Sequence, residues 1–215
     1  CGADIAEGLD EGGDPLIGGR DWSVLGIICV TCKRQAFRYR ARVNPDAFYR
    51  ICDRWGRLYN NALLAPENNG TMGGTVIQGL REMARYPNLY HDDPHPSALI
   101  KSSRTLKDFT YGWETNAGNK GLVLDQFRQA IQGKSEDPLE DFRPEITVLD
   151  QIFFDEVFTF KNQDGKLTHE QGHHDDTIMA WAIAYQMYLR VLGRWSGPMG
   201  ERDLLIGGRM ESSKF

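Results

Sequence analysis

The stretch Trp22–Val43, WSVLGIICVTCKRQAFRYRARV, determines how the chain is expected to fold. Its first part is a nearly continuous apolar run and, with the preceding Asp21, predicts a strand over Asp21–Thr31. Its second part, Gln35–Val43, alternates between two kinds of side chain. One face is apolar, with Phe37, Tyr39, Ala41 and Val43, and the other is basic, with Arg34, Arg38, Arg40 and Arg42. Alternation with period two predicts a strand that is apolar on one side only.

Working outward from this strand pair, Asn44–Pro45 predicts the start of a helix, with Asn as the cap and Pro in the first turn. An apolar stripe at helical spacing carries this helix to Leu58. A short apolar strand at Ala62–Ala65 and a helix at Thr71–Arg85 follow. Upstream, residues 1–6 are expected to be the end of a first strand.

The second half of the chain has weaker patterns. Residues 97–116 are expected to be irregular, as is the polar turn His91–His95. Further on, the sequence predicts a helix at Gly118–Gln132, strands at Ile146–Leu149 and Val157–Lys161, a hairpin turn through Asn162–Gly165, and a final helix at Asp175–Leu192. This order predicts an α/β fold in which a mixed β-sheet is flanked by helices.

Composition limits the function less than it limits the fold. The chain has 215 residues, of which 40% are apolar, and a formal net charge of -5. That charge does not by itself indicate a DNA-binding protein, although a nuclease that gathers acids around metal ions can be acidic overall. No apolar run reaches 18 residues, so no transmembrane helix is expected. The N-terminus lacks both Met and the pattern of a signal peptide, and we expect a fragment of a longer protein.

The Cys29–Cys32 pair forms a C-x-x-C motif, which occurs in zinc and redox sites. Here the motif falls at the end of a predicted strand, where residues three apart point to opposite faces. No second C-x-x-C completes a four-ligand zinc site. We therefore expect reduced, partly buried thiols.

Acidic residues stand at the ends of predicted elements that are far apart in the sequence. Asp4 ends the first strand, Glu67 follows the short apolar strand, and Asp175 and Asp176 begin the last helix. Each acid has an ordinary explanation, because acids cap helices and occupy turns. Together they predict carboxylates converging at one edge of the sheet. Phosphodiester hydrolysis by two divalent ions about 4 Å apart requires such a set, because Mg²⁺ and Mn²⁺ prefer carboxylate ligands.

Several short motifs, in order along residues 1–193, resemble the nuclease domain of the large terminase subunit of tailed bacteriophages, a branch of the RNase H-like superfamily. They are Asp4-Ile5-Ala6-Glu7-Gly8, Arg20-Asp21-Trp22-Ser23, Glu67-Asn68-Asn69-Gly70, Tyr111-Gly112-Trp113-Glu114-Thr115-Asn116 with Asn119-Lys120, and Gly172-His173-His174-Asp175-Asp176-Thr177-Ile178-Met179-Ala180. The resemblance implies an RNase H-like fold and a metal-dependent endonuclease that cuts double-stranded viral DNA during genome packaging.

The resemblance also implies roles for individual residues. Asp4, Glu67 and Asp176 are expected to be catalytic and, with Asp175, to bind two divalent ions, Mg²⁺ or Mn²⁺. Asp21, His174 and Lys120 are secondary candidates. Basic residues expected to contact DNA are Arg38, Arg40, Lys101, Arg104 and Lys120.

The same resemblance implies a setting for the domain. Residues 1–193 are expected to form the endonuclease domain and 194–215 a C-terminal tail. The family's ATPase has a Gly-rich phosphate loop, and no G-x-x-x-x-G-K-[ST] occurs here, so this chain alone is not expected to hydrolyse ATP. The expected partners are double-stranded DNA and, in the full-length protein, the portal and the small terminase subunit. The isolated domain is expected to be monomeric, without a membrane partner, and to act in the host cytoplasm.

Two alternatives remain open. The fold also serves junction resolvases and RNase H-type nucleases, which cut other substrates. A third interpretation is a domain of this fold that only binds DNA or a portal partner, with structural acids.

Overall fold

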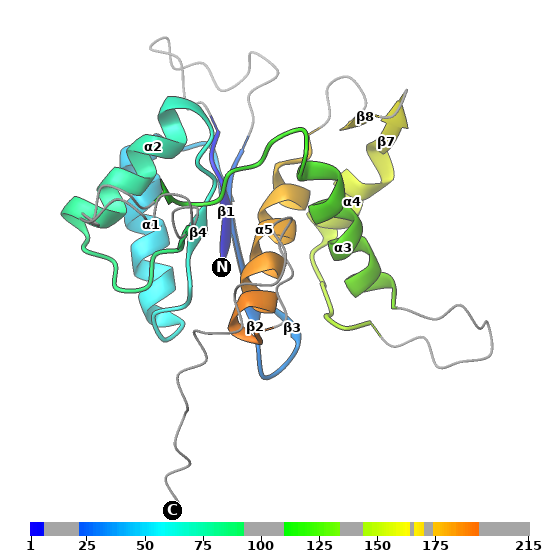
Figure 1. Cartoon of the computed structure of the whole chain (residues 1–215), viewed down its shortest axis with the longest axis horizontal. Helices are drawn as coiled ribbons and strands as arrows, with labels where there is room; N and C mark the ends of the chain where they lie inside the picture. Colours follow the sequence, from blue (N-terminus) through cyan, green and yellow to red (C-terminus); the bar gives the residue numbers. More distant parts are fainter. Residues whose placement is uncertain (7–21, 93–109, 134–143, 164–165, 170–173, 194–215) are drawn as a thin grey trace, which may run out of the picture.

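The fold centres on a four-stranded mixed sheet in the order β3-β2-β1-β4 (Figure 1). The computed structural model describes residues 1–6, 22–92, 110–133, 144–163, 166–169 and 174–193. Strands β1 (Gly2–Asp4), β2 (Ser23–Cys29) and β3 (Arg34–Ala41) are antiparallel neighbours, and the short β4 (Ala65–Pro66) runs parallel to β1. The strand pair predicted from Trp22–Val43 is therefore β2 and β3, with β3 at the edge of the sheet and β2 inside it.

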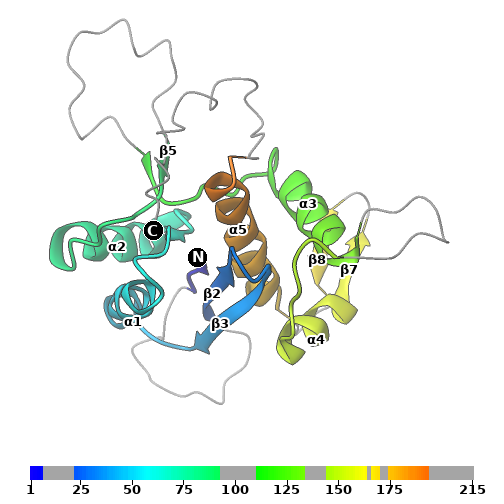
Figure 2. The ribbon, with the colours of Figure 1, turned by 90° about the horizontal axis from the view of Figure 1, so that it is seen from below.

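Helices cover both faces of this sheet, as the view from below shows (Figure 2). On one face lie α1 (Pro45–Leu58) and α2 (Gly70–Gln78), which continues as a π-helical turn, η1 (Gly79–Met83). On the other lies α5 (Asp176–Val191), backed by α3 (Lys120–Gln132) and α4 (Gln151–Thr159). The predicted α/β class, a mixed sheet flanked by helices, is confirmed.

Helix α5 is the central element of the core. Every residue from Asp176 to Leu189 is buried, which is typical of a helix covered on all sides. The helix packs directly on β1 and β2, and glycines permit the close approach. A Cβ at Gly2 would lie 2.8 Å from the carbonyl carbon of Ile183, and one at Gly26 would lie 3.0 Å from the Trp181 ring. No helix among the described residues is long and apolar enough to cross a membrane.

The alternation predicted in β3 is confirmed. Phe37 stacks on Trp55 of α1 with ring centroids 3.9 Å apart, so the apolar face points toward α1 and α2. The opposite face carries Arg38 and Arg40, whose partners are acids at the start of α4 and within it.

Three predictions of local structure were wrong. Residues 146–149 form no strand and contribute one parallel bridge, between Thr147 and Arg34. Residues 157–159, predicted to begin a strand, instead end helix α4. Phe153 and Glu156 are buried at helical spacing, and this packing overrides the strand preference of Val and Phe. A short ladder joins β5 (His91–Asp92) to β6 (Thr110–Tyr111), where loop was expected. The predicted hairpin is present as β7 (Phe160–Gln163) and β8 (Lys166–His169).

The prediction for Cys29 and Cys32 assumed that both lie on one strand, and this assumption was wrong. Strand β2 ends at Cys29, and Cys32 lies in the turn that leads to β3. The two side chains therefore do not point to opposite faces of a strand. Both are free thiols, with Cys29 partly buried and Cys32 exposed.

Candidate metal centre

Strand pairing brings Asp4 and Glu67 to the same edge of the sheet. In the parallel ladder Ala3 lies opposite Pro66, and the two acids are the next residues along: Asp4 ends β1 and Glu67 directly follows β4. The Glu67 amide donates a hydrogen bond to the Ala3 carbonyl at 2.8 Å, which fixes the two backbones side by side. Asp4 is partly buried and Glu67 is 8% exposed. The two carboxyl groups consequently share a confined space.

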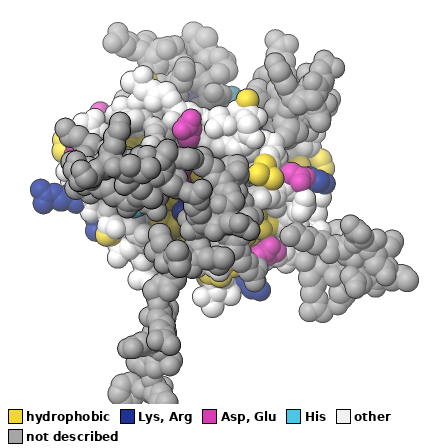
Figure 3. Space-filling model, in the orientation of Figure 1, with side chains coloured by type: hydrophobic (Ala, Val, Ile, Leu, Met, Phe, Trp, Pro, Cys, Tyr) yellow, Lys and Arg dark blue, Asp and Glu magenta, His cyan; other side chains and the backbone are white. Residues whose placement is uncertain are grey.

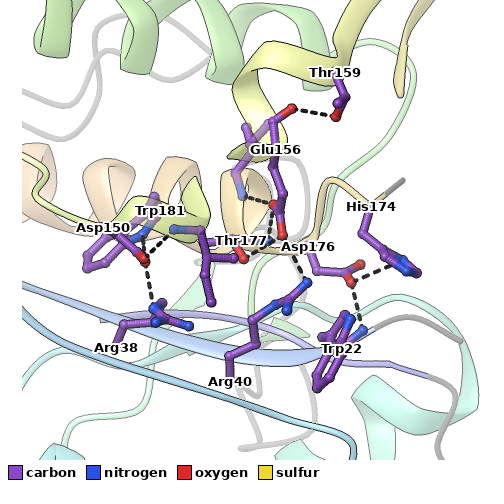
Figure 4. Close-up of polar contacts among 12 residues, drawn as sticks. Trp22, Arg38, Arg40, Asp150, Glu156, Thr159, His174, Asp176, Thr177 and Trp181 are labelled. Atoms are coloured by element: carbon purple, nitrogen blue, oxygen red, sulfur yellow. Dashed lines mark hydrogen bonds and ion pairs between the residues drawn. The ribbon is translucent and has the colours of Figure 1, made fainter. Parts of the chain in front are cut away.

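Asp176 reaches this edge from the other layer of the fold. It is the first residue of α5, which packs across β1, and it is 6% exposed. Its Oδ2 accepts a hydrogen bond from the Trp22 amide at 2.6 Å and lies 3.8 Å from His174 Nδ1 (Figure 4). The backbone just before β2 thus holds the Asp176 carboxylate.

The electrostatics of Asp4 show that the acids are neighbours. Burial raises the pKa of Asp4 well above its ordinary range, and the charge of Glu67 and a hydrogen bond shared with Glu67 raise it further. Asp176 and then Asp175 add smaller repulsions. Because like charges in one site disfavour ionisation, Asp4 holds a proton more tightly than a solvated Asp does. Three of the four predicted metal-binding acids therefore act on the fourth, Asp4.

Asp175 does not act as a simple helix cap. It occupies the N-cap position of α5, but its side chain makes no capping hydrogen bond. Instead its Oδ2 lies 3.0 Å from Lys120 Nζ, at the start of α3. The structure thus brings together Asp175 and Lys120, 55 residues apart in the sequence, beside Asp176.

The carboxylates suit a hard divalent cation by their chemistry, since they offer oxygen ligands only. Their crowding is the observation that favours such an ion, because a cation would relieve the repulsion that raises the pKa of Asp4. Among the residues that the structure describes, however, no three His, Cys, Asp or Glu side chains are already arranged as a metal-binding group. The acids are close enough to interact, and binding an ion would require side-chain adjustment and an ionised Asp4 carboxylate.

Two of the arginines expected to contact DNA are engaged inside the protein. Arg38 Nε lies 2.7 Å from Asp150 Oδ2, and Arg40 Nη2 lies 3.3 Å from Glu156 Oε1 (Figure 4). Arg40 also stacks over the Trp22 ring at 4.1 Å. DNA contact by either arginine stays a prediction. Asp21, Lys101 and Arg104 lie outside the described residues, as does the predicted tail 194–215.

Glu156 is a site residue that the sequence analysis missed. It is 6% exposed and accepts hydrogen bonds from the Thr177 amide at 2.8 Å, the Thr177 hydroxyl at 2.7 Å and the Ile178 amide at 3.2 Å. It thereby satisfies the first amides of α5, directly after Asp176. Burial raises the pKa of Glu156, while the Thr177 hydrogen bond and Arg40 oppose the rise.

Asp150, which directly precedes α4, plays a related role. It is 4% exposed, accepts hydrogen bonds from the Ile152 amide at 3.1 Å and from Trp181 Nε1 at 3.3 Å, and pairs with Arg38. An Asp before the run Gln151–Phe154 is a recognisable helix-start signal. Glu156 directly precedes Val157–Lys161, which was predicted to be a strand, so the helix that positions Glu156 was not anticipated.

Comparisons with known proteins support the fold. No family model and no curated protein matches the sequence. Among solved structures, the large terminase nuclease from thermophilic phage G20c is similar, with a TM-score of 0.52 and 15% sequence identity. The match covers 86% of this chain and 78% of that one. The chain is therefore related in structure to a terminase nuclease.

Proposed function

We propose that this chain is the nuclease domain of a phage large terminase subunit and cuts double-stranded DNA with the help of divalent metal ions. One observation carries the proposal. Acids from three separate elements lie together at one edge of the sheet, where burial and the charges of Glu67, Asp176 and Asp175 raise the pKa of Asp4. The structural likeness to a terminase nuclease agrees with this assignment.

In this proposal Asp4, Glu67 and Asp176 are the catalytic carboxylates and, with Asp175, hold two Mg²⁺ or Mn²⁺ ions. When bound, such ions activate water for attack on a phosphodiester and stabilise the charge that develops on the phosphate. The chain's own groups orient the ligands. The Trp22 amide and His174 hold Asp176, and Glu156 fixes the helix start behind it.

Lys120 is the candidate for a phosphate contact. Its ammonium group pairs with Asp175 at 3.0 Å and its side chain is 35% exposed, so it is both beside the acids and accessible. A cation there would offset charge on the scissile phosphate. Arg38 and Arg40, together with Lys101 and Arg104, are further proposed DNA contacts, although internal ion pairs already engage the first two.

Binding to DNA by the isolated domain is expected to be weak and strongly salt-dependent. The chain carries a net charge of -5, and on the described surface visible in Figure 3 the basic side chains are scattered among acidic ones. Backbone contacts dominate such binding and carry no sequence information. In the full-length protein, the ATPase, the portal and the small subunit are the proposed sources of further affinity.

The test is a cleavage assay with purified protein and Mn²⁺ on duplex DNA, a four-way junction and an RNA–DNA hybrid. The proposal expects duplex cleavage that chelation abolishes, and its loss in Asp4→Asn and Asp176→Asn. The matched control is Asp155→Asn, an exposed acid on α4, which should cleave as the original does. Preference for the hybrid would contradict the terminase assignment. Retained cleavage in folded Asp4→Asn and Asp176→Asn would contradict the site.

A further inference from the structure

The turn between β2 and β3 brings two thiols together at the surface. Cys29 ends β2 and Cys32 lies in the turn, where the Cys32 amide donates a hydrogen bond to Cys29 Sγ at 3.2 Å. The turn is closed by the Lys33 amide bonding to the Cys29 carbonyl at 2.9 Å, with Lys33 at a φ of 53°. Thr147 bonds to the Lys33 carbonyl at 2.9 Å, so the turn is fixed from outside as well.

The two thiols are chemically unequal. The hydrogen bond from the Cys32 side chain lowers the pKa of Cys29, and the Cys32 amide and the charge of Arg34 lower it further. The same thiol–thiol hydrogen bond raises the pKa of Cys32. Amide donors and a nearby guanidinium are the surroundings in which cysteines become nucleophilic thiolates. Of the two thiols, Cys29 therefore ionises more readily.

The surroundings also allow a small oxidant to approach. A hollow of about 860 Å³ is lined in part by Cys29, Cys32 and Arg34. A disulfide requires Cα atoms about 4.4–6.8 Å apart, and residues three apart across a tight turn lie within about 7 Å. The other two cysteines, Cys1 and Cys52, are buried, and burial raises the pKa of Cys52 strongly.

We propose that Cys29 and Cys32 are a redox-active dithiol, a modification site that low-molecular-weight disulfides convert to an internal disulfide. The Cys29 thiolate attacks one sulfur of the small disulfide RSSR, forming a mixed disulfide and releasing RS⁻, which takes up the proton that Cys29 lost. Cys32 then loses its proton and attacks Cys29 Sγ. This forms the Cys29–Cys32 bond and releases the second RSH, so the protein loses two electrons and two protons and RSSR gains them.

This inference does not rest on the proposed nuclease function. Val24, at the start of β2, pairs with Asp4, whereas Cys29 is at the opposite end of that strand. Substitutions at the turn therefore leave the carboxylates untouched.

The test is equilibration of the reduced protein with mixtures of reduced and oxidised glutathione, followed by alkylation and mass spectrometry. Both thiols lie in one tryptic peptide, residues 21–33, and the buried Cys52, which does not line the hollow, serves as the internal control. We expect this peptide to lose two hydrogens and escape alkylation under mixtures in which Cys52 remains reduced. A peptide that stays fully alkylated, or that stops at a mixed disulfide, would overturn the proposal.

Single variants test the inequality of the thiols. Cys32→Ser should accumulate the glutathione mixed disulfide on Cys29. At neutral pH its remaining turn thiol should also react with iodoacetamide several-fold faster than that of Cys29→Ser. Cys32 is the more exposed thiol, so if exposure alone governed the rate the order would reverse, and that result would contradict the assignment of Cys29 as the attacking thiol.

Discussion

Replacing Glu156 with Gln tests whether this carboxylate holds the start of α5. The side chain accepts two amide hydrogen bonds and one hydroxyl hydrogen bond at the helix N-terminus and lies 3.3 Å from Arg40 Nη2. Gln keeps the shape but loses the charge and turns an NH₂ group toward donors. Hydrogen bonds to charged groups contribute about 1.5–3 kcal/mol each, and breaking a buried ion pair costs about 3–5 kcal/mol.

These contributions do not add in full, because burying an ionised carboxylate is itself costly. The raised pKa of Glu156 reflects that cost. We therefore expect Glu156→Gln to lower the free energy of unfolding by about 3 kcal/mol. For a chain of this size that corresponds to a Tm lower by roughly 6–12 °C. Urea unfolding followed by circular dichroism measures the loss, with exposed Asp155→Asn on the same helix as the control, expected within about 0.5 kcal/mol of the original.

The same variant has a functional readout. Glu156 acts through the backbone of α5 and does not itself touch a metal, so it is a positioning residue. At a temperature where the variant is fully folded, we expect metal-dependent cleavage to fall about 10-fold or more, as when outer partners of metal ligands are removed. A variant as stable and as active as the original would refute the reasoning that Glu156 fixes the helix start.

Three further predictions follow from the packing and the charges. Asp4→Asn should raise the Tm in EDTA at pH 8 by a few degrees while abolishing cleavage, because it removes the repulsion between Asp4 and the neighbouring acids. Each unit by which the pKa of Asp4 is raised corresponds to about 1.4 kcal/mol. An unchanged or lower Tm would contradict this prediction. Because the pKa of Asp4 is raised in the folded state, the unmodified protein should lose stability as the pH rises from the ordinary pKa of an Asp side chain through the raised pKa. Unfolding at a series of pH values should show a shallower loss in Asp4→Asn. Gly2→Ala should cost about 3 kcal/mol or more, since its Cβ would meet the backbone of α5, and thermal unfolding equal to the original would contradict the close packing.

Helices and strands were predicted best from the sequence where a long pattern of apolar and polar residues marks an element buried on one side only. The alternation in Gln35–Val43 gave the correct strand faces, and the positions of Asp4, Glu67 and Asp176 at element ends correctly indicated that these acids lie near one another. Prediction failed where packing overrides local preference. Val157 reads as strand but ends a helix whose inward face is set by Phe153 and Glu156.

Partners distant in the sequence account for the other gaps. Nothing local to Arg38 or Arg40 indicates ion pairs with Asp150 and Glu156, more than 100 residues away. Likewise, Cys29 and Cys32 come together because β2 ends at Cys29. The sequence did not show this end, because the apolar run continues past it to Val30.

The most direct test of the carboxylate centre is a crystal of this protein soaked in Mn²⁺, with the ions located by anomalous diffraction. We expect two ions between Asp4, Glu67 and Asp176, about 4 Å apart, with Asp175 beside them. A single ion bound elsewhere, or no ion at these acids in a well-ordered soaked crystal, would contradict it.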